Sequence, residues 1–346
     1  MDLPPLPYVS GDRLLGSTDT VFSLTPCSVS RHIHAQSVCH NTVFDTISGG
    51  FYRVVWSDEG DTGIPSLEEI PDAECRHFPG SESFEIIATC SYRGNFYMYV
   101  RLKRGHTEGY TAGQPGYLWV YQIDTDTWTK HTGPPDYLYD FAALIGYKGT
   151  LFLFQSMCDR GNVSVDQIGL DPIEPRRWER RVWTFPETEG DSAIIHDALP
   201  FVLSDELHVM LPGQGESDSY YHLVLKGQAW EAVTGAVTVP HELSASMGYP
   251  FGNKWLAPGF GSRCTNLQRG MAQFDAVSSE WSFVCLCDWQ ILDAAQLSPC
   301  THLVRTYGMP AERRNIYISG LYILHTDLAI LEDRSSGLLP GDVGCE

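Results

Sequence analysis

Six polar residues recur at one position of a repeating pattern in this sequence of 346 residues. Each lies eleven residues before the first apolar residue of a strand-like segment that follows a turn; they are His40, Glu85, Asp140, His196, Ser244 and Arg305. Two histidines with a glutamate and an aspartate could hold a metal ion or exchange protons with a substrate. The competing interpretation is that strand ends beside water are simply polar. If the fold gathers these residues at one end of a channel, they predict a ligand-binding site at that mouth.

A second set of possible metal ligands lies near the N-terminus. An extended segment would place His32 and His34 on one face of a strand, with Cys39 and His40 close behind. Zinc and copper sites use such side chains, but a surface loop with unrelated histidines has the same appearance, and we favour the loop. The acidic segment 57–61 lacks the ligand spacing of a calcium loop. We therefore predict no bound metal and no cofactor.

One basic cluster differs from the acidic remainder of the chain. It consists of Arg176, Arg177, Arg180 and Arg181, interleaved with Trp178 and Trp183. Arginine and tryptophan are enriched in binding hot spots, and the arginine fork recognises anions. The alternative is an exposed strand edge that charge protects from aggregation. We predict that these arginines contact a protein partner rather than nucleic acid.

Charge and composition narrow the classes of function. The chain has 23 Lys and Arg against 43 Asp and Glu, and the resulting net charge of −20 argues against binding to nucleic acid or to anionic membrane surfaces. It predicts instead a protein partner with a basic surface. Hydrophobic residues make up 43% and charged residues 19%, so the chain has enough apolar surface to fold as a globular protein.

Signals of cellular location point to the cytoplasm. The N-terminus lacks a basic region followed by an apolar stretch, and no run of about 18 apolar residues predicts membrane insertion. The ten cysteines include no Cys-x-x-Cys pair and are too sparse for a disulfide scaffold, so we expect reduced thiols in the core. The sequence has no nucleophile elbow, zinc-protease motif, phosphate loop or dinucleotide fingerprint. This combination favours a non-enzymatic protein of the cytoplasm.

The elements that would position these residues are short aromatic or β-branched strands, separated by Gly, Pro, Asp, Asn and Ser. Four tryptophans recur at spacings of 50, 52 and 51 residues: Trp128, Trp178, Trp230 and Trp281. A second series opens the strand that follows each turn: Phe51, Phe96, Leu151, Leu207, Trp255 and Ile316. Small residues in the preceding strands fit inner strands that converge on an axis: Ala88, Ala142, Ala143, Ala198 and Ser246. The period predicts four-stranded units that must stack to bury their faces, and one short helix is expected near 288–295.

The repeating unit resembles the kelch repeat, most closely over 121–128, which reads Tyr-Gln-Ile-Asp-Thr-Asp-Thr-Trp, and over 147–154. The resemblance covers 84–283 in four copies. It departs from the kelch pattern because the double glycine that normally ends the second strand is replaced, for example by Val100 and Arg101. The chain is thus similar to a divergent kelch-type propeller, and this resemblance implies a protein that mostly holds other proteins.

Together these patterns predict an all-β propeller of about six four-stranded blades. Seven blades are the alternative count, and a two-sheet sandwich or two all-β domains are the alternative folds. We expect residues 1–38 to form an N-terminal segment that supplies a closing strand at 20–24, residues 39–333 to form the propeller, and residues 334–346 to form a flexible tail.

The predicted function is non-enzymatic protein–protein interaction or scaffolding, as a subunit of a larger assembly. The alternative is a propeller enzyme, or a protein that binds carbohydrate or another small ligand at the channel mouth.

Overall fold

The computed structural model of the chain describes residues 22–26, 35–39, 41–46, 48–56, 66–71, 77–103, 116–134, 141–157, 162–170, 177–184, 198–212, 220–233, 248–260, 270–286, 289–298, 301–308 and 318–326. These residues form 24 strands and one short 3-10 helix, η1 (Ile123–Thr125). No helix within these ranges has the length and apolar character needed to cross a membrane.

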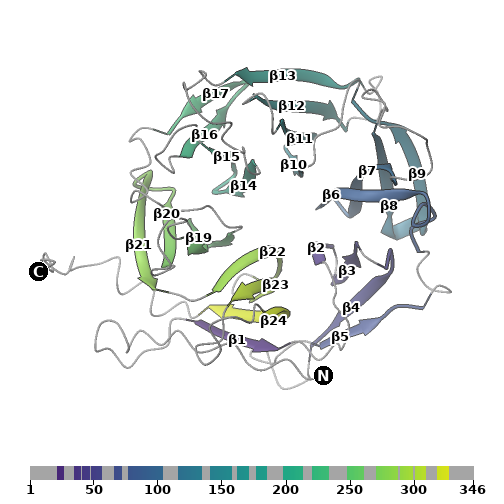
Figure 1. Cartoon of the computed structure of the whole chain (residues 1–346), viewed down its shortest axis with the longest axis horizontal. Helices are drawn as coiled ribbons and strands as arrows, with labels where there is room; N and C mark the ends of the chain where they lie inside the picture. The colour runs from purple at the N-terminus through teal and green to yellow at the C-terminus, as the bar shows by residue number, and fades with distance from the viewer. Residues whose placement is uncertain are drawn as a thin grey trace, which may run out of the picture.

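The strands form six four-stranded antiparallel sheets, arranged around a central axis as the blades of a propeller (Figure 1). In each sheet one strand lies next to the axis and the other three follow outward. The predicted all-β propeller with about six four-stranded blades is therefore confirmed for the described part of the chain. A ring gives each sheet a neighbour on either side, so both apolar faces of a blade can be buried.

The blades are numbered along the chain, and the strands of each blade are given from the axis outward. Blade 1 contains β2 (Ala35–Cys39), β3 (Thr42–Asp45), β4 (Phe51–Val55) and β5 (Ser66–Glu69). Blade 2 contains β6 (Phe84–Tyr92), β7 (Asn95–Leu102), β8 (Tyr117–Gln122) and β9 (Thr127–Thr132). Blade 3 contains β10 (Phe141–Tyr147), β11 (Thr150–Met157), β12 (Asn162–Gly169) and β13 (Glu179–Thr184).

The second half of the ring repeats this order. Blade 4 contains β14 (Leu199–Leu203), β15 (Glu206–Pro212), β16 (Tyr220–Lys226) and β17 (Ala229–Ala232). Blade 5 contains β18 (Tyr249–Phe251), β19 (Lys254–Phe260), β20 (Gly270–Asp275) and β21 (Glu280–Leu286). Blade 6 contains β22 (Trp289–Ser298), β23 (Thr301–Gly308), β24 (Ile318–Thr326) and, outermost, β1 (Phe22–Pro26).

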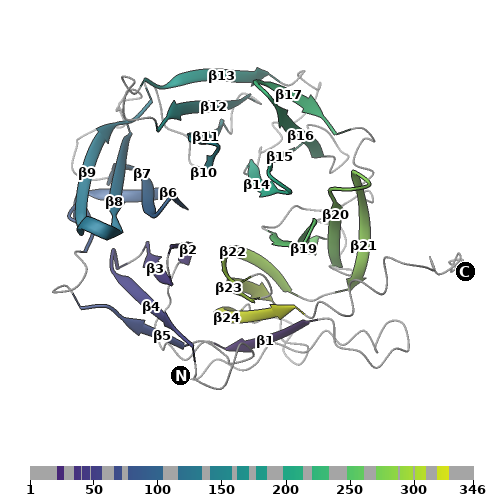
Figure 2. The same ribbon diagram turned by 180° about the vertical axis from the view of Figure 1, so that it is seen from behind.

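Strand β1 joins the two ends of the described chain. It pairs antiparallel with β24, and Leu24 lies opposite Leu324 (Figure 2). The last blade is therefore completed by a strand from the N-terminal segment, at the place where the sequence analysis expected one over 20–24. The tail expected over 334–346 lies outside the described residues.

Two-residue turns join the inner strand to the second strand in the middle blades. Positive φ angles occur at both turn residues in three of them: Arg93 and Gly94, Lys148 and Gly149, Ser204 and Asp205. Two successive positive φ angles give the turn a twist that matches the twist of the two strands, and Gly and Asp tolerate this conformation best. The sequence series built on these turns is correct here, because Phe96, Leu151, Leu207 and Trp255 each occupy the second position of the second strand.

In blades 1 and 6, the first and last of the ring, the residues of this series do not mark the second strand. Phe51 begins β4, which is the third strand of blade 1, whereas the second strand, β3, begins at Thr42. In blade 6 the second strand begins at Thr301, and Ile316 lies outside the described residues. The turn before β4 resembles the others in sequence, but it connects the second and third strands of its blade and not the first and second.

The tryptophan series marks the outer strands. Trp128, Trp230 and Trp281 lie in β9, β17 and β21, each opposite a residue of the third strand, and Trp178 immediately precedes β13. The turn that resembles a kelch repeat contains η1 and ends at Asp126, which has a φ of 48° and accepts a hydrogen bond from the Tyr121 hydroxyl at 3.0 Å. A local turn therefore fixes where the outer strand β9 begins.

The helix expected near 288–295 is wrong. These residues lie largely in β22, which spans Trp289–Ser298 and pairs with β23 from Trp289 opposite Gly308 to Ser298 opposite Thr301. A sequence such as Asp-Ala-Ala-Gln has good intrinsic helix propensity, but hydrogen bonds along a whole inner strand override that preference.

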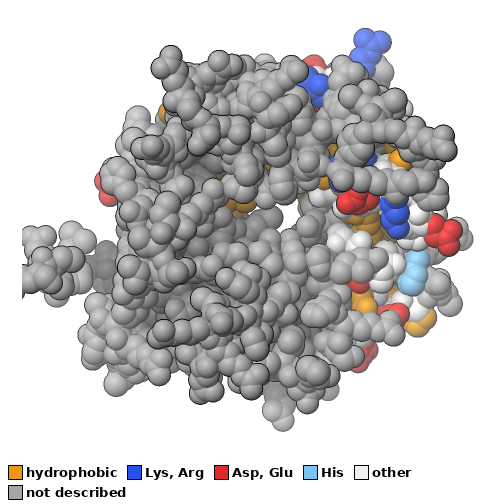
Figure 3. Space-filling model, viewed as in Figure 1, with side chains coloured by type: hydrophobic (Ala, Val, Ile, Leu, Met, Phe, Trp, Pro, Cys, Tyr) orange, Lys and Arg blue, Asp and Glu red, His pale blue; other side chains and the backbone are white. Residues whose placement is uncertain are grey.

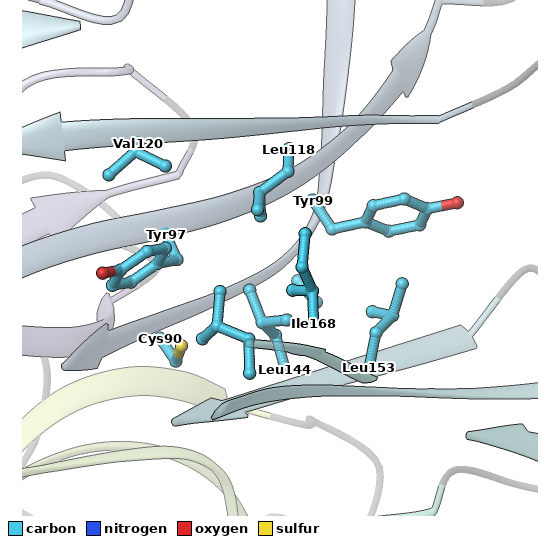
Figure 4. Close-up of a cluster of buried hydrophobic side chains, with 10 residues drawn as sticks. Cys90, Tyr97, Tyr99, Leu118, Val120, Leu144, Leu153 and Ile168 are labelled. Carbon is cyan, nitrogen blue, oxygen red and sulfur yellow. The ribbon is translucent and has the colours of Figure 1, made fainter. Parts of the chain in front are cut away.

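The hydrophobic core lies between neighbouring blades. Figure 4 shows the cluster between blades 2 and 3, in which Tyr97 and Leu118 of one blade meet Leu144 and Leu153 of the next. Cys90 belongs to this cluster, and burial raises the pKa of its thiol, so that the sulfur stays protonated and unreactive. Packing of this kind between successive sheets holds the inner strands around the axis.

Candidate functional site

The inner strands enclose a cavity of about 420 Å³ on the propeller axis. Residues of β6, β10, β14, β18 and β22 line it, and the space-filling view is hollowed at this point (Figure 3). Much of the wall is made of small residues: Ala88, Ala142, Ala143, Gly248, Ala294 and Ala295. Small side chains let the inner strands approach the axis and still leave space between them, as the sequence analysis expected for Ala88, Ala142 and Ala143.

The described wall of this cavity carries no Asp, Glu, Lys or Arg side chain. Its polar side chains include those of Thr89, Ser91, Gln296 and His302. Burial lowers the pKa of His302 from 6.5 to about 4, so the imidazole is neutral at pH 7. The cavity therefore presents an uncharged surface with a few hydrogen-bonding groups, which suits binding of a neutral molecule.

His302 is a fully buried polar residue of the cavity wall. It lies in β23 with no solvent exposure, and its ring is 4.7 Å from the ring of Tyr249 in β18, between centroids. Within the described part of the chain, neither of its ring nitrogens has a hydrogen-bond partner. A buried donor and acceptor without partners are costly, so a hydroxyl that reached this ring would gain a favourable pairing.

Replacing His302 with phenylalanine is expected to make stability less sensitive to acid. Between pH 6.5 and about 4 the unfolded chain takes up a proton that folded His302 does not, so stability falls as the pH falls through this range. At pH 5.5 His302→Phe should gain about 1.2 kcal/mol over wild type, relative to the difference at pH 7. Urea denaturation at both pH values measures this gain. An unchanged difference would show that His302 titrates normally.

Two further buried histidines bridge blades 4 and 5. Nδ1 of His208 lies 3.1 Å from Nε2 of His222, and Trp281 Nε1 donates a hydrogen bond of 3.2 Å to Nδ1 of His222. Because the indole nitrogen can only donate, His222 must carry its proton on Nε2 and donate it to His208. His208 then carries its own proton on Nε2, 3.9 Å from a carboxylate oxygen of Glu206.

Both histidines are neutral at pH 7 because they are buried. Burial is the largest effect on each, and it lowers the pKa of His208 to about 4 and that of His222 to about 3. Neither residue lines the axial cavity. The ring of Phe274 in blade 5 lies 5.5 Å from that of His208 and 4.4 Å from that of His222 between centroids, so the pair is part of the packing between blades. The sequence analysis missed these two residues, because a histidine in an apolar strand gives no sign of its partner.

The structure describes the side chains of two of the four predicted arginines, and their surroundings differ. Arg177 is exposed, whereas Arg180 binds Asp166 through Nε at 2.7 Å and through Nη2 at 3.2 Å. Arg181 lies in β13 but its side chain is not described, and Arg176 lies outside the described residues. The role of these arginines in partner binding stays a prediction, and Arg177 is the one whose described side chain faces solvent.

Little of the predicted polar ring falls within the described residues. Glu85 lies at the start of the inner strand β6, where it is exposed and accepts a hydrogen bond of 2.8 Å from Arg101. Arg305 lies inside β23, opposite Asp293 and Leu321, and not at the start of an inner strand, because the series was out of phase in blade 6. The other four members lie outside the described residues: His40, Asp140, His196 and Ser244.

A metal site is not evident in the described residues, which contain no group of three or more His, Cys, Asp or Glu side chains that could hold an ion. His32 and His34 lie outside those residues, and Cys39 ends β2. The role of the polar ring in ligand binding stays a prediction. The axial cavity is thus the candidate site that the described side chains support.

Comparison with known proteins supports the fold. No protein-family profile and no curated protein matches the sequence. The structure is similar to that of YjhT, with 11% identity, a TM-score of 0.50 and coverage of 87% of this chain and 95% of that one. A protein of unknown function from Dyadobacter fermentans is 14% identical, with a TM-score of 0.45 and coverage of 88% and 98%. Zg3597, a family 117 glycoside hydrolase from Zobellia galactanivorans, is 14% identical, with a TM-score of 0.40 and coverage of 82% and 91%. At 11% identity the likeness to YjhT concerns the fold alone.

Proposed function

We propose that this protein is a non-enzymatic binding protein that holds a small uncharged molecule in its axial cavity. The uncharged wall of the cavity carries the proposal, because its described side chains bear no charge at pH 7. Hydrolysis and group transfer usually need a positioned acid or base, whereas a largely apolar pocket with a few polar groups is typical of ligand binding. A volume of about 420 Å³ is in the range of small-molecule sites.

The chemistry of the wall suits a hydroxylated ligand. On one side, Phe201 and Trp255 stack at 4.2 Å between centroids, with an angle of 16° between their planes. Aromatic rings pack well against the apolar face of a sugar or a similar cyclic molecule. Ser91 and Gln296 offer a hydroxyl and an amide, which both donate and accept hydrogen bonds. A neutral sugar or polyol is therefore the ligand class that we propose.

A panel of neutral sugars and polyols, examined by ligand-observed NMR, tests this proposal. At least one member should bind the wild-type protein, and Ala142→Leu should weaken that binding about tenfold or more, because the larger side chain fills the cavity. Ala229→Leu is the matched control, since Ala229 is exposed on the outer strand β17. Binding that survives Ala142→Leu, or no binding by any neutral member, would contradict the proposal.

A second candidate function is contact with a protein partner that has a basic surface. The observation that favours it is the net charge of −20 over 346 residues, which attracts a positive surface over long range. The exposed Arg177 is positively charged, unlike the acidic chain as a whole, and would contact an acidic group on the same partner. Assignment to the divergent kelch type belongs with this proposal, as does a cytoplasmic location, which fits the buried, reduced Cys90. Salt-dependent co-purification of a basic protein would support it.

A further inference from the structure

The ammonium group of Lys130 is surrounded by three aromatic rings of blade 2. Its Nζ lies 3.7 Å from the ring centroid of Tyr117, 4.8 Å from that of Phe84 and 5.8 Å from that of Trp119. All three distances are within the range in which a cation is attracted by the face of a ring. We call these four residues the Lys130 cage.

The fold builds this cage from separate strands. Lys130 in β9 lies directly opposite Trp119 in β8, and Tyr117 is on the same face of β8, two residues away. Phe84 begins the inner strand β6. Its ring meets the Tyr117 ring edge-on at 5.5 Å and the Trp119 ring at 6.3 Å, between centroids. The rings therefore hold one another in place whether or not a cation lies between them.

A fourth ring, that of Phe78, packs against Trp119. Phe78 packs edge-on against it at 5.4 Å, with an angle of 89° between the planes. In the described part of the chain, the buried Trp119 Nε1 has no hydrogen-bond partner. The indole is thus held by ring packing alone, and this packing leaves its face turned to the Lys130 ammonium.

The other described cation–π contacts are simpler. Arg93 lies 5.2 Å from the ring of Tyr92, and Lys148 lies 4.9 Å from that of Tyr147. Each is a contact with the neighbouring residue of the same turn, which local geometry alone can produce. The Lys130 cage instead combines rings from two strands that are not adjacent in the blade, β6 and β8, with a cation from a third strand.

Lys130 is a replaceable occupant. The residue is exposed, and in the described residues no carboxylate is paired with its ammonium. A primary ammonium is strongly hydrated and has three N–H donors that ring faces satisfy poorly. A trimethylammonium group has no such donors, loses less hydration on entering a cage, and keeps the full positive charge that the ring faces attract.

We propose that the Lys130 cage is a binding site for a trimethylammonium group, which displaces the Lys130 ammonium into solvent. The inference goes beyond the proposed function, because the cage shares no residue with the wall of the axial cavity. Lys130 competes with the ligand and weakens its binding, so removing the lysine side chain should reveal the site.

Titration with choline, followed by ligand-observed NMR, tests the proposal. Lys130→Ala should bind choline about tenfold more tightly than the wild-type protein, because the competing ammonium is gone. The control ligand is 3,3-dimethyl-1-butanol, which has the shape of choline without its charge and should not bind. Equal binding of the two ligands, or no choline binding by Lys130→Ala, would overturn the proposal.

Ring variants test the geometry. In the Lys130→Ala background, Tyr117→Leu should weaken choline binding about tenfold, whereas Tyr117→Phe should preserve it because the ring face remains. Urea denaturation establishes that each variant is folded. An unchanged affinity in folded Tyr117→Leu would overturn the assignment.

Two sources of the group are separated by a further comparison. A peptide with trimethyllysine that binds more tightly than both choline and its unmethylated counterpart identifies a methylated protein as the ligand. Tighter binding of choline identifies a small quaternary amine. Choline binding that persists in the Ala142→Leu variant would also separate this site from the axial cavity.

Discussion

Replacing Asp166 with alanine is expected to lower the free energy of unfolding by about 3–5 kcal/mol. The Asp166 side chain in β12 has no solvent exposure, and its carboxylate accepts hydrogen bonds of 2.7 Å from both Arg180 and Gln155. Without the carboxylate, the guanidinium of Arg180, whose side chain is only 26% exposed, loses its ionic partner in a poorly solvated place. The amide of Gln155, which is buried in β11, also loses the bond that its Nε2 makes.

Urea denaturation of the wild-type and variant proteins measures this loss. Asp166→Asn separates charge from shape, because the amide keeps the volume and one acceptor but cannot form an ion pair. Glu206→Gln is the matched control, since Glu206 pairs with Lys226 at the surface and should change stability by less than about 1 kcal/mol. A loss within 1 kcal/mol for Asp166→Ala would show that the buried pair contributes no more than a surface pair.

Asp166 also illustrates what the sequence could not provide. The run of arginines around Trp178 is plain in the sequence and suggests a binding surface. In the pairing of β12 with β13, however, Arg180 lies directly opposite Asp166, so its guanidinium forms an ion pair within the blade. Nothing in the sequence indicates that Asp166 and Arg180 are partners. Only the pairing of their strands shows that Arg180 stabilises blade 3.

The ring architecture could be predicted because its signals are local. A two-residue turn with positive φ angles favours Gly or Asp, as at Gly94 and Asp205, and these residues show in the sequence where the next strand begins. The tryptophan of the outer strand follows a similarly compact turn at Asp126. Such signals fail at the ends of the ring, where Phe51 follows a turn between β3 and β4 rather than the turn after an inner strand.

The candidate site was harder to predict than the fold. Counting eleven residues back reaches the start of an inner strand only where the anchor opens the second strand of a blade, and the anchor used for Arg305 instead precedes β24, the third strand of blade 6. The buried histidines escaped notice for another reason. His302 contacts Tyr249 of the preceding blade, so its burial depends on how two blades pack and not on the residues beside it in sequence.

Gly146 in β10 of blade 3 lies directly against Tyr92 of blade 2. A Cβ added there would lie 2.3 Å from Cγ of Tyr92 and 2.5 Å from its Cβ, which no side chain can tolerate. Tyr92 ends the inner strand of blade 2, and its hydroxyl accepts a hydrogen bond of 2.8 Å from the backbone N–H of Gly149. The missing side chain at position 146 therefore lets a tyrosine of one blade bind the turn of the next.

Gly146→Ala should thus lower the free energy of unfolding by about 3 kcal/mol, from overpacking and from loss of the hydrogen bond to Tyr92. Gly169→Ala is the control, because an added Cβ there meets no atom within 4 Å, and it should change stability by less than about 0.5 kcal/mol. If Tyr92 is the cause, Gly146→Ala should cost less than about 1 kcal/mol in a Tyr92→Gly background, which removes the Cβ and Cγ atoms that the added Cβ would meet. Urea denaturation of the four proteins of this cycle decides the matter: an equal cost in both backgrounds would mean that the glycine is required for another reason than the contact between blades.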